Sequence, residues 1–262
     1  MSGRAIAGVV GVVVVAAALW VGVRNMGSGG GAGTPAPAAR TAWGEPDLTG
    51  VWKGEALGAS AGRDTFNLAA LEGLYTPDAR ARMQKMSAKD DPTLQCAPPA
   101  FPRAATLGHQ WQIVQSPGFA FVFTEAYPVA RIIPTTGRGH TPEQYLFPSH
   151  MGDSTARWDG DTLVVDVTSF NGEGWLAGPL DKPTSASAGV WPMSTATHIV
   201  ERWRRVDADT LEYRARVEDP DVLTTPWETP IVTLKRQPLD VIDEVLCRPE
   251  DGPESYLARL GS

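Results

Sequence analysis

Apolar and polar residues alternate along most of the chain after residue 109. Segments 111–126, 157–167 and 198–219 contain runs in which about every second residue is apolar, and Gly, Pro, Asp or Asn interrupts these runs. This period is typical of β-strands, and the Asp159-Gly160 pair is a strong hairpin signal. Strand-sized runs with hardly a helix between them predict an all-β domain, either an antiparallel closed barrel or a sandwich. Closure is favoured because a large open sheet leaves its edge strands unpaired.

A second pattern precedes the strands. Between residues 57 and 89, apolar side chains recur at helical spacing, at Leu68, Leu71, Leu74, Ala79, Met83 and Met86. This spacing predicts one or two short helices near residues 65–88, divided near Pro77, with Thr76 as an N-cap. Residues 91–103 contain too many prolines for regular structure.

The N-terminal part of the chain has a different composition. Residues 5–23 carry no charged side chain, and about 20 apolar residues are enough to cross a bilayer as a helix. Residues 25–42 are rich in Gly, Ala and Pro, as in flexible linkers. We therefore predict a transmembrane signal anchor at residues 1–24, a linker at 25–42 and a β-barrel domain at 43–262.

These features predict a single-pass protein of the bacterial inner membrane with its domain in the periplasm. The alternative is a secreted protein whose long signal peptide is cleaved. The formal net charge of −7 gives no concentrated basic surface, so a nucleic-acid partner is not expected. In an exported protein, the two cysteines Cys96 and Cys247 predict a disulfide that ties the start of the domain to its last strand. The alternative is a pair of buried free thiols.

Period-two spacing assigns side chains to opposite faces of each predicted strand. Asp166 falls on the more polar face of its strand, so we expect it to be solvated. Glu201 lies on an apolar face, with His198 on the opposite face of the same strand, and Glu125 follows three phenylalanines on one face of another strand. An acid on such a face must be paired, hydrogen-bonded or protonated, which makes both candidate catalytic residues. The alternative is a strand end that reaches water or an ion pair with Arg131, Arg138 or Arg202.

The histidines add candidates for acid–base chemistry. His140 and His150 lie in loop-like segments where the mouth of a barrel would be, and imidazole is the side chain most often used for proton transfer. None of the four histidines has a metal-ligand spacing, and the sequence lacks a nucleophile elbow, a phosphate-binding loop and a dinucleotide fingerprint. No metal and no cofactor is therefore expected. Two arginines are candidates for binding a substrate anion and four aromatic residues for lining a ligand pocket: Arg131, Arg138, Trp111, Trp175, Trp203 and Tyr213.

Several phrases resemble a large group of exported bacterial proteins without an assigned activity. They include PDLTGVW at 46–52, RWDGDTLVV at 157–165 and HIVERWRR at 198–205. The resemblance covers nearly everything from Trp43 to Cys247 and implies a shared domain type, but no mechanism. The chain departs from the group at His150, where an aromatic residue normally stands, and in the insertion-like stretch 182–197. The GVW phrase at 50–52 is also similar to the first strand of lipocalin-like barrels.

Together, these patterns predict a membrane-anchored extracytoplasmic β-barrel that binds a hydrophobic small molecule. A further hypothesis is that the barrel transforms this molecule by proton transfer, as a cofactor-independent isomerase, cyclase, hydratase or lyase. Glu125, Glu201, His140 and His150 would then move the protons. The alternative is a non-catalytic periplasmic binding or assembly module.

Overall fold

The computed structural model describes residues 39–54, 68–127, 129–177, 190–245 and 247–248. The chain divides into residues 1–34 and residues 35–262, and every described residue belongs to the second unit. The predicted anchor and most of the predicted linker therefore lie outside the described residues. Within the described ranges, no helix is both long and apolar enough to cross a membrane.

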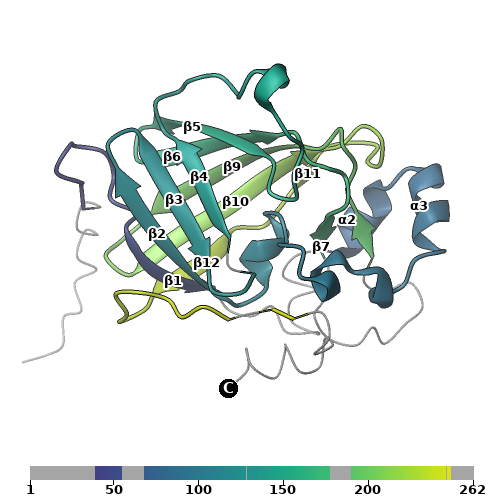
Figure 1. Cartoon of the computed structure of the whole chain (residues 1–262), viewed down its shortest axis with the longest axis horizontal. Coiled ribbons are helices and arrows are strands. Elements are labelled where there is room, and N and C mark those ends of the chain that lie inside the picture. Colours follow the sequence, from purple (N-terminus) through teal and green to yellow (C-terminus); the bar gives the residue numbers. More distant parts are fainter. Residues whose placement is uncertain (1–38, 55–67, 128, 178–189, 246, 249–262) are drawn as a thin grey trace, which may run out of the picture. The chain divides into compact units, whose positions relative to one another are not determined.

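The second unit is built around one antiparallel sheet that curls into a nearly closed barrel (Figure 1). In order along the sheet, the strands are β4 (Ala130–Pro134), β3 (Phe119–Thr124), β2 (Gln110–Ser116), β1 (Gly50–Gly54), β12 (Val232–Arg236), β10 (Thr210–Glu218), β9 (His198–Arg205), β6 (Thr162–Thr168) and β5 (Asp153–Asp159). A short strand, β11 (Trp227–Glu228), pairs with β10, and β7 (Trp175–Ala177) pairs with β8 (Trp191–Pro192) in a separate small sheet. Of the two predicted architectures, the barrel is the one that forms.

The three hairpins that the alternation predicts are present. Strands β2 and β3 form the first, β5 and β6 the second, and β9 and β10 the third. In the second hairpin, Asp159 lies opposite Thr162, and Gly160 at its turn has a φ of 60°. Glycine adopts this left-handed conformation without the steric cost that a Cβ atom brings. The Asp-Gly pair therefore sets the register of the hairpin that carries Asp166.

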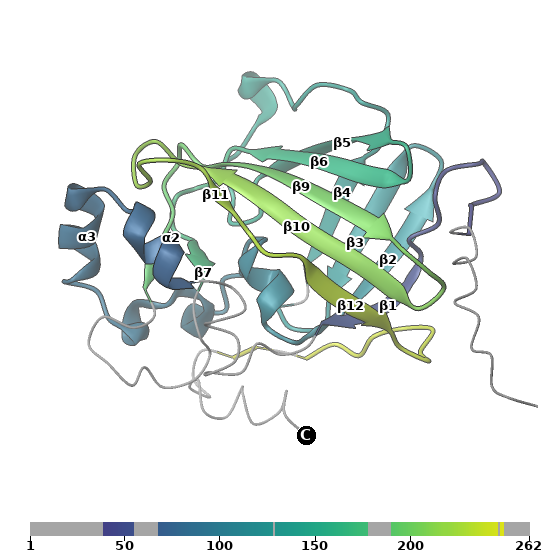
Figure 2. The same cartoon turned by 180° about the vertical axis from the view of Figure 1, so that it is seen from behind.

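Two short α-helices occupy the predicted region. Helix α2 (Leu68–Leu74) and helix α3 (Pro77–Met83) are separated by Tyr75 and Thr76, and the Thr76 hydroxyl accepts a hydrogen bond from the Ala79 backbone N–H at 3.2 Å, as an N-cap does. The helices lie beyond one end of the barrel (Figure 2), where the Tyr75 hydroxyl donates to the Pro192 carbonyl at 2.9 Å. The short 3-10 helices are η1 (Ala88–Asp90), η2 (Pro92–Gln95), η3 (Arg103–Thr106) and η4 (Glu143–Tyr145).

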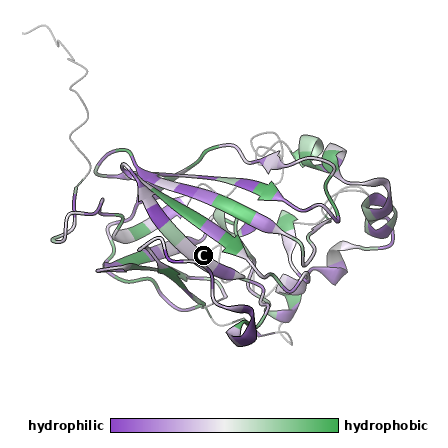
Figure 3. Cartoon of the chain, turned by 90° about the horizontal axis from the view of Figure 1, so that it is seen from above, coloured by the Kyte–Doolittle hydropathy of each residue, from purple (hydrophilic) through white to green (hydrophobic). Residues whose placement is uncertain are grey.

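Hydrophobic and hydrophilic residues alternate along the barrel strands, as the banded colouring in Figure 3 shows. The inward side chains form one continuous core, of which Trp52 on β1 is a fully buried member. Its indole Nε1 donates to the Leu48 carbonyl at 2.9 Å, and the guanidinium groups of Arg205 and Arg236 lie 5.5 and 5.9 Å from the ring centroid. These contacts satisfy the polar end of the indole and use its face for cation–π attraction.

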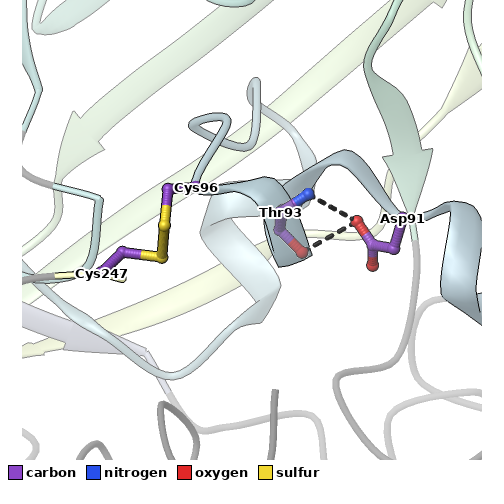
Figure 4. Close-up of a disulfide and its surroundings, with 4 residues drawn as sticks. All are labelled: Asp91, Thr93, Cys96 and Cys247. Carbon is purple, nitrogen blue, oxygen red and sulfur yellow. Dashed lines mark hydrogen bonds between the residues drawn. A yellow bond between two sulfur atoms is a disulfide. The ribbon is translucent and has the colours of Figure 1, made fainter. Parts of the chain in front are cut away.

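Cys96 and Cys247 lie at disulfide distance, with their Cα atoms 5.6 Å apart (Figure 4). Cys96 follows η2, whose first turn is fixed by Asp91, because Asp91 Oδ1 accepts hydrogen bonds from the backbone N–H and the hydroxyl of Thr93 at 2.9 and 2.8 Å. The predicted pairing therefore joins the proline-rich segment between β1 and β2 to the segment after β12, so that Cys247 lies beyond the last strand and not on it. A bond between residues separated by 151 positions stabilises the fold by on the order of 5 kcal/mol in the chain-entropy account.

Candidate functional site

The two end strands of the sheet, β4 and β5, lie beside each other along a line that we call the seam. No described backbone ladder joins them, and side chains and loop backbone bridge them instead. Arg131 Nε on β4 donates to Ser154 Oγ on β5 at 2.9 Å, and the Gly137 backbone N–H donates to the Ala156 carbonyl at 2.8 Å. The seam is therefore the place where polar groups of the barrel interior reach a gap in the sheet.

Arg131 also belongs to an ion pair inside the barrel. Its Nη1 donates to both carboxylate oxygens of Glu201 on β9, at 3.0 and 2.8 Å, and Trp203 Nε1 donates to Glu201 Oε2 at 3.0 Å. Glu201 is fully buried and Arg131 is 5% exposed. The sequence placed Glu201 on the inner face with Arg131 among its possible partners, and this pairing is present. Because the carboxylate already accepts from a guanidinium and an indole, Glu201 is the counter-ion of Arg131 and not a free general base.

Aromatic side chains pack around this ion pair. Trp203 lies against Trp111 and Tyr213, with ring centroids 5.4 and 5.0 Å away. Phe101 reaches in from the proline-rich segment, and the Arg131 guanidinium lies 5.2 Å from its ring. Burial, and then the negative charge of Glu201, raise the pKa of Tyr213 well above its ordinary value, so its hydroxyl stays protonated. Side chains therefore fill the surroundings of the ion pair in the described part of the interior.

A pocket of about 420 Å³ opens at the seam, and we call it the seam pocket. Its wall combines apolar residues with polar ones: Pro98, Val129, Ile132, Met151, Arg131, His150, Asp153 and Ser154. Two buried nitrogens of this lining, Arg131 Nη2 and His150 Nδ1, have no hydrogen-bond partner among the described residues. Buried polar atoms are nearly always paired with protein, water or ligand. Both residues line the pocket, but these two nitrogens are covered by neighbouring atoms and do not face it as free donors.

A second group of polar side chains lies on the outer face of β5, β6 and β9. We call Asp153, His140, Asp166 and His198 the outer-face cluster. His140 Nδ1 lies 2.8 Å from Asp153 Oδ2 and its Nε2 lies 2.9 Å from Asp166 Oδ1, while His198 Nε2 lies 3.0 Å from that same Asp166 oxygen. Ionised carboxylates only accept hydrogen bonds. While both carboxylates are ionised, each ring nitrogen of His140 needs a proton to donate to its partner, so these contacts favour the cationic form of this side chain.

The charges of the cluster follow from these contacts. Burial lowers the pKa of His140, but the hydrogen bonds and charges of Asp166 and Asp153 outweigh this effect, and the net direction is upward. Burial likewise opposes ionisation of Asp153, yet hydrogen bonds from the backbone and hydroxyl of Thr141 and from His140 lower its pKa. The cluster therefore ties the loop that carries His140 and Thr141 to the edge of the barrel. Asp153 also lines the seam pocket, so the two groups adjoin.

The remaining candidates are spread over the molecule. Arg138 is exposed, and its backbone carbonyl accepts from the Thr155 hydroxyl at 2.6 Å. Trp175 is buried in the small sheet, where the Arg103 guanidinium lies 5.5 Å from its ring. The structure therefore brings together Arg131, Glu201, Trp111, Trp203 and Tyr213. It places His150 at the seam, His140 on the outer face, Arg138 two residues before His140, and Trp175 in the small sheet.

The interpretation of Glu125 as an acid facing the barrel interior is wrong. Phe119 and Phe123 are 41% and 36% exposed, whereas Ala120 and Val122 are buried, so the phenylalanine row faces outward. Glu125 accepts hydrogen bonds from the backbone N–H and the side-chain amide of Gln110, at 3.0 and 2.9 Å. The period-two argument grouped these side chains correctly but assigned the group to the inner face, because large aromatic residues are usually buried.

Sequence reasoning missed Phe101, Ser154 and the role of Asp153. Phe101 lies in a segment without periodicity, so no face could be assigned to it. The outer-face position of Asp166 and the opposite positions of His198 and Glu201 were predicted, but the contact of Asp166 with His140 depends on a loop path that no local pattern encodes. Among the described residues, no group of three or more His, Cys, Asp and Glu side chains is arranged to hold a metal ion.

Comparison with known proteins gives no family: no protein-family model matches the chain, and no curated protein matches it.

Proposed function

We propose that the barrel domain binds a small, mainly apolar molecule in the seam pocket, beside Arg131 and His150. The observation that carries this proposal is the lining of the pocket, in which apolar residues such as Ile132 and Met151 surround a few polar ones.

The size and wall of the pocket support the same proposal. Its volume of about 420 Å³ falls in the range of small-molecule sites, which are mostly apolar with a few placed polar groups. The proposal moves the ligand from the barrel interior, where the sequence predicted it, to the seam, because aromatic side chains pack around the interior ion pair. The anchored periplasmic location predicted from residues 1–24 belongs to the proposal as well.

The test is a pocket-filling substitution on the full-length protein. Ile132 lines the seam pocket and is 56% exposed, so Ile132→Trp adds bulk at the mouth of the pocket at little cost to the core. Phe147→Trp is the matched control, because Phe147 is 86% exposed and does not line the pocket. The probe is Nile red, an uncharged dye whose fluorescence rises in apolar surroundings.

We expect the wild type and Phe147→Trp to bind Nile red equally, and Ile132→Trp to bind it at least about tenfold more weakly, equivalent to about 1.4 kcal/mol. No binding by the wild type, or equal binding by all three proteins, would overturn the seam pocket as a ligand site and favour the non-catalytic assembly module.

A further inference from the structure

A second hollow adjoins the seam pocket on the outer face of the barrel. This outer groove has a volume of about 630 Å³ and lies between β2, β3 and the segment 241–244. Val129 and Ala130 line both hollows. A molecule bound at the seam can therefore continue into the outer groove past the first residue of β4.

Much of the wall of the outer groove is apolar. Val114, Phe123, Val241 and Ile242 contribute to it together with the shared residues Val129 and Ala130. The sequence pattern predicts an inward face for the phenylalanines of β3. They face outward, and Phe123 supplies part of this wall. Exposed apolar surface on a sheet is typical of a binding surface when it is contiguous, and here the groove gives it a concave shape.

The far wall of the outer groove is held in place. Gln112 Nε2 donates to the Asp240 carbonyl at 2.9 Å, and the Val245 backbone N–H donates to the Glu125 carbonyl at 3.1 Å. Cys247, two residues after Val245, is joined to Cys96 by the disulfide. Two hydrogen bonds therefore hold the segment 239–245 to the barrel, and the disulfide holds the chain beyond it to the residue that follows η2.

The charges around both hollows decide the kind of ligand. Arg131 already has Glu201 as its counter-ion and Asp153 has His140, so the seam pocket has no uncompensated positive charge for a carboxylate. The outer groove is lined by Asp243 and Glu244, and its described lining contains no Lys, Arg or His. A ligand anion would add negative charge beside these acids and beside Glu201, which costs free energy. An uncharged polar end adds no such charge.

We infer that the ligand of the seam pocket is an elongated, uncharged molecule whose apolar chain lies in the outer groove and whose uncharged polar end lies in the seam pocket. This inference rests on the proposed function and replaces the prediction that Arg131 and Arg138 hold a substrate anion. Arg138 is exposed and does not line either hollow, and Arg131 is already neutralised.

The first part of the test compares ligands of equal chain length on the full-length protein by calorimetric titration at about pH 7, above the pKa of a carboxylic acid. The probes are 2-decanone, decanoate and decylamine. We expect 2-decanone to bind at least about tenfold more tightly than either charged probe. Binding of decanoate or decylamine as tight as that of the ketone overturns the inference but leaves the seam pocket as a ligand site.

The second part tests the outer groove. From 2-hexanone to 2-decanone, affinity should rise about fourfold for each added methylene, the factor that corresponds to about 0.8 kcal/mol per buried CH₂. Val241→Asp places a charge in the groove and should remove most of this rise. Leu239→Asp is the matched control, because Leu239 is exposed on the same segment and does not line the groove. If the two substitutions have equal effects, the apolar chain of the ligand does not lie in the outer groove.

Failure of the inference and failure of the proposed function are distinguishable. If no probe binds and Ile132→Trp changes nothing for Nile red, the ligand site itself is wrong. If Nile red binding depends on Ile132 while the ketone has no advantage over the charged probes, only the ligand class is wrong.

Discussion

The inner and outer faces of the barrel carry two groups of charged side chains with opposite properties. On the inner face, Arg131 and Glu201 pair in full burial. On the outer face, His140 lies between Asp153 and Asp166 with roughly a third of its side chain exposed, 29%. Water screens the outer group and can replace its contacts, whereas nothing replaces the contacts of the inner pair. The inner pair is therefore a structural requirement, and the outer group responds to pH.

The largest expected effect comes from breaking the inner pair. Glu201→Gln leaves the Arg131 charge buried without a counter-ion, and removing one partner of a buried pair costs about 3–5 kcal/mol. Urea unfolding followed by tryptophan fluorescence measures this loss. The double variant Arg131→Met with Glu201→Leu should recover most of it, because two apolar residues need no counter-ion. A loss below about 1 kcal/mol in Glu201→Gln would show that the pair is not the structural element proposed here.

The next effect comes from His109, which is buried, whereas His140 is partly exposed. Burial, with a smaller contribution from Lys53 and against the charge of Glu125, lowers the pKa of His109 to about 4. An unfolded histidine has a pKa of about 6.5, so between these values the unfolded chain binds more protons and stability falls as the pH falls. The full difference corresponds to about 3 kcal/mol.

His109→Gln should remove this dependence. Urea unfolding at about pH 7.5 and about pH 4.5 should show a difference in unfolding free energy that is smaller in the variant by about 2–3 kcal/mol. A variant with the pH profile of the wild type would show that His109 is accessible to protons in the folded protein.

The outer-face cluster should make the unfolding free energy depend on pH in the opposite direction. The pKa of His140 is raised in the folded protein, so its contribution is complete below the unfolded pKa of about 6.5 and is lost as the pH rises through the folded pKa. The groups that face the cluster are Asp153 on β5, Asp166 on β6, His198 on β9 and, 4.0 Å from His198 Nδ1, Glu218 on β10.

His140→Gln should therefore cost about 1 kcal/mol near pH 6, and the cost should shrink as the pH rises above the folded pKa. Unfolding curves across this range test the sign directly. A cost that grows with pH would mean that His140 is neutral in the cluster. His198→Gln is the control, because His198 contacts one carboxylate at hydrogen-bond distance where His140 contacts two.

The same contrast explains how much the sequence could predict. The period of two assigned Glu201 to the inner face and Asp166 and His198 to the outer face, because a strand within a sheet obeys this rule residue by residue. The rule relates side chains to one another but does not say which face is inner. For β3, the small residues Ala120 and Val122 face the core, and the phenylalanines face outward, where Phe123 lines the outer groove beside the segment 241–244.

Contacts made by loops could not be predicted in this way. The contacts of Phe101, His140 and Asp153 depend on the paths of loops, and these paths are set by tertiary packing. The seam could not be predicted either, because it depends on how β4 and β5 meet after the sheet has curled. The disulfide could be predicted without knowing the path of any loop, because Cys96 and Cys247 are the two cysteines of the chain. In the structure their Cα atoms are 5.6 Å apart.

The smallest expected loss of unfolding free energy comes from an exposed ion pair, and the larger losses can be compared with it. Arg204 and Glu212 form a cross-strand ion pair on the outer face, 2.9 Å apart, with side chains 54% and 30% exposed. Because exposed pairs contribute about 0.2–1 kcal/mol, Glu212→Gln should change the unfolding free energy by less than about 0.5 kcal/mol, and added salt should reduce even that difference. Urea unfolding at low and high salt measures both quantities. A cost close to that of Glu201→Gln would mean that pairing, and not burial, explains the importance of the inner pair.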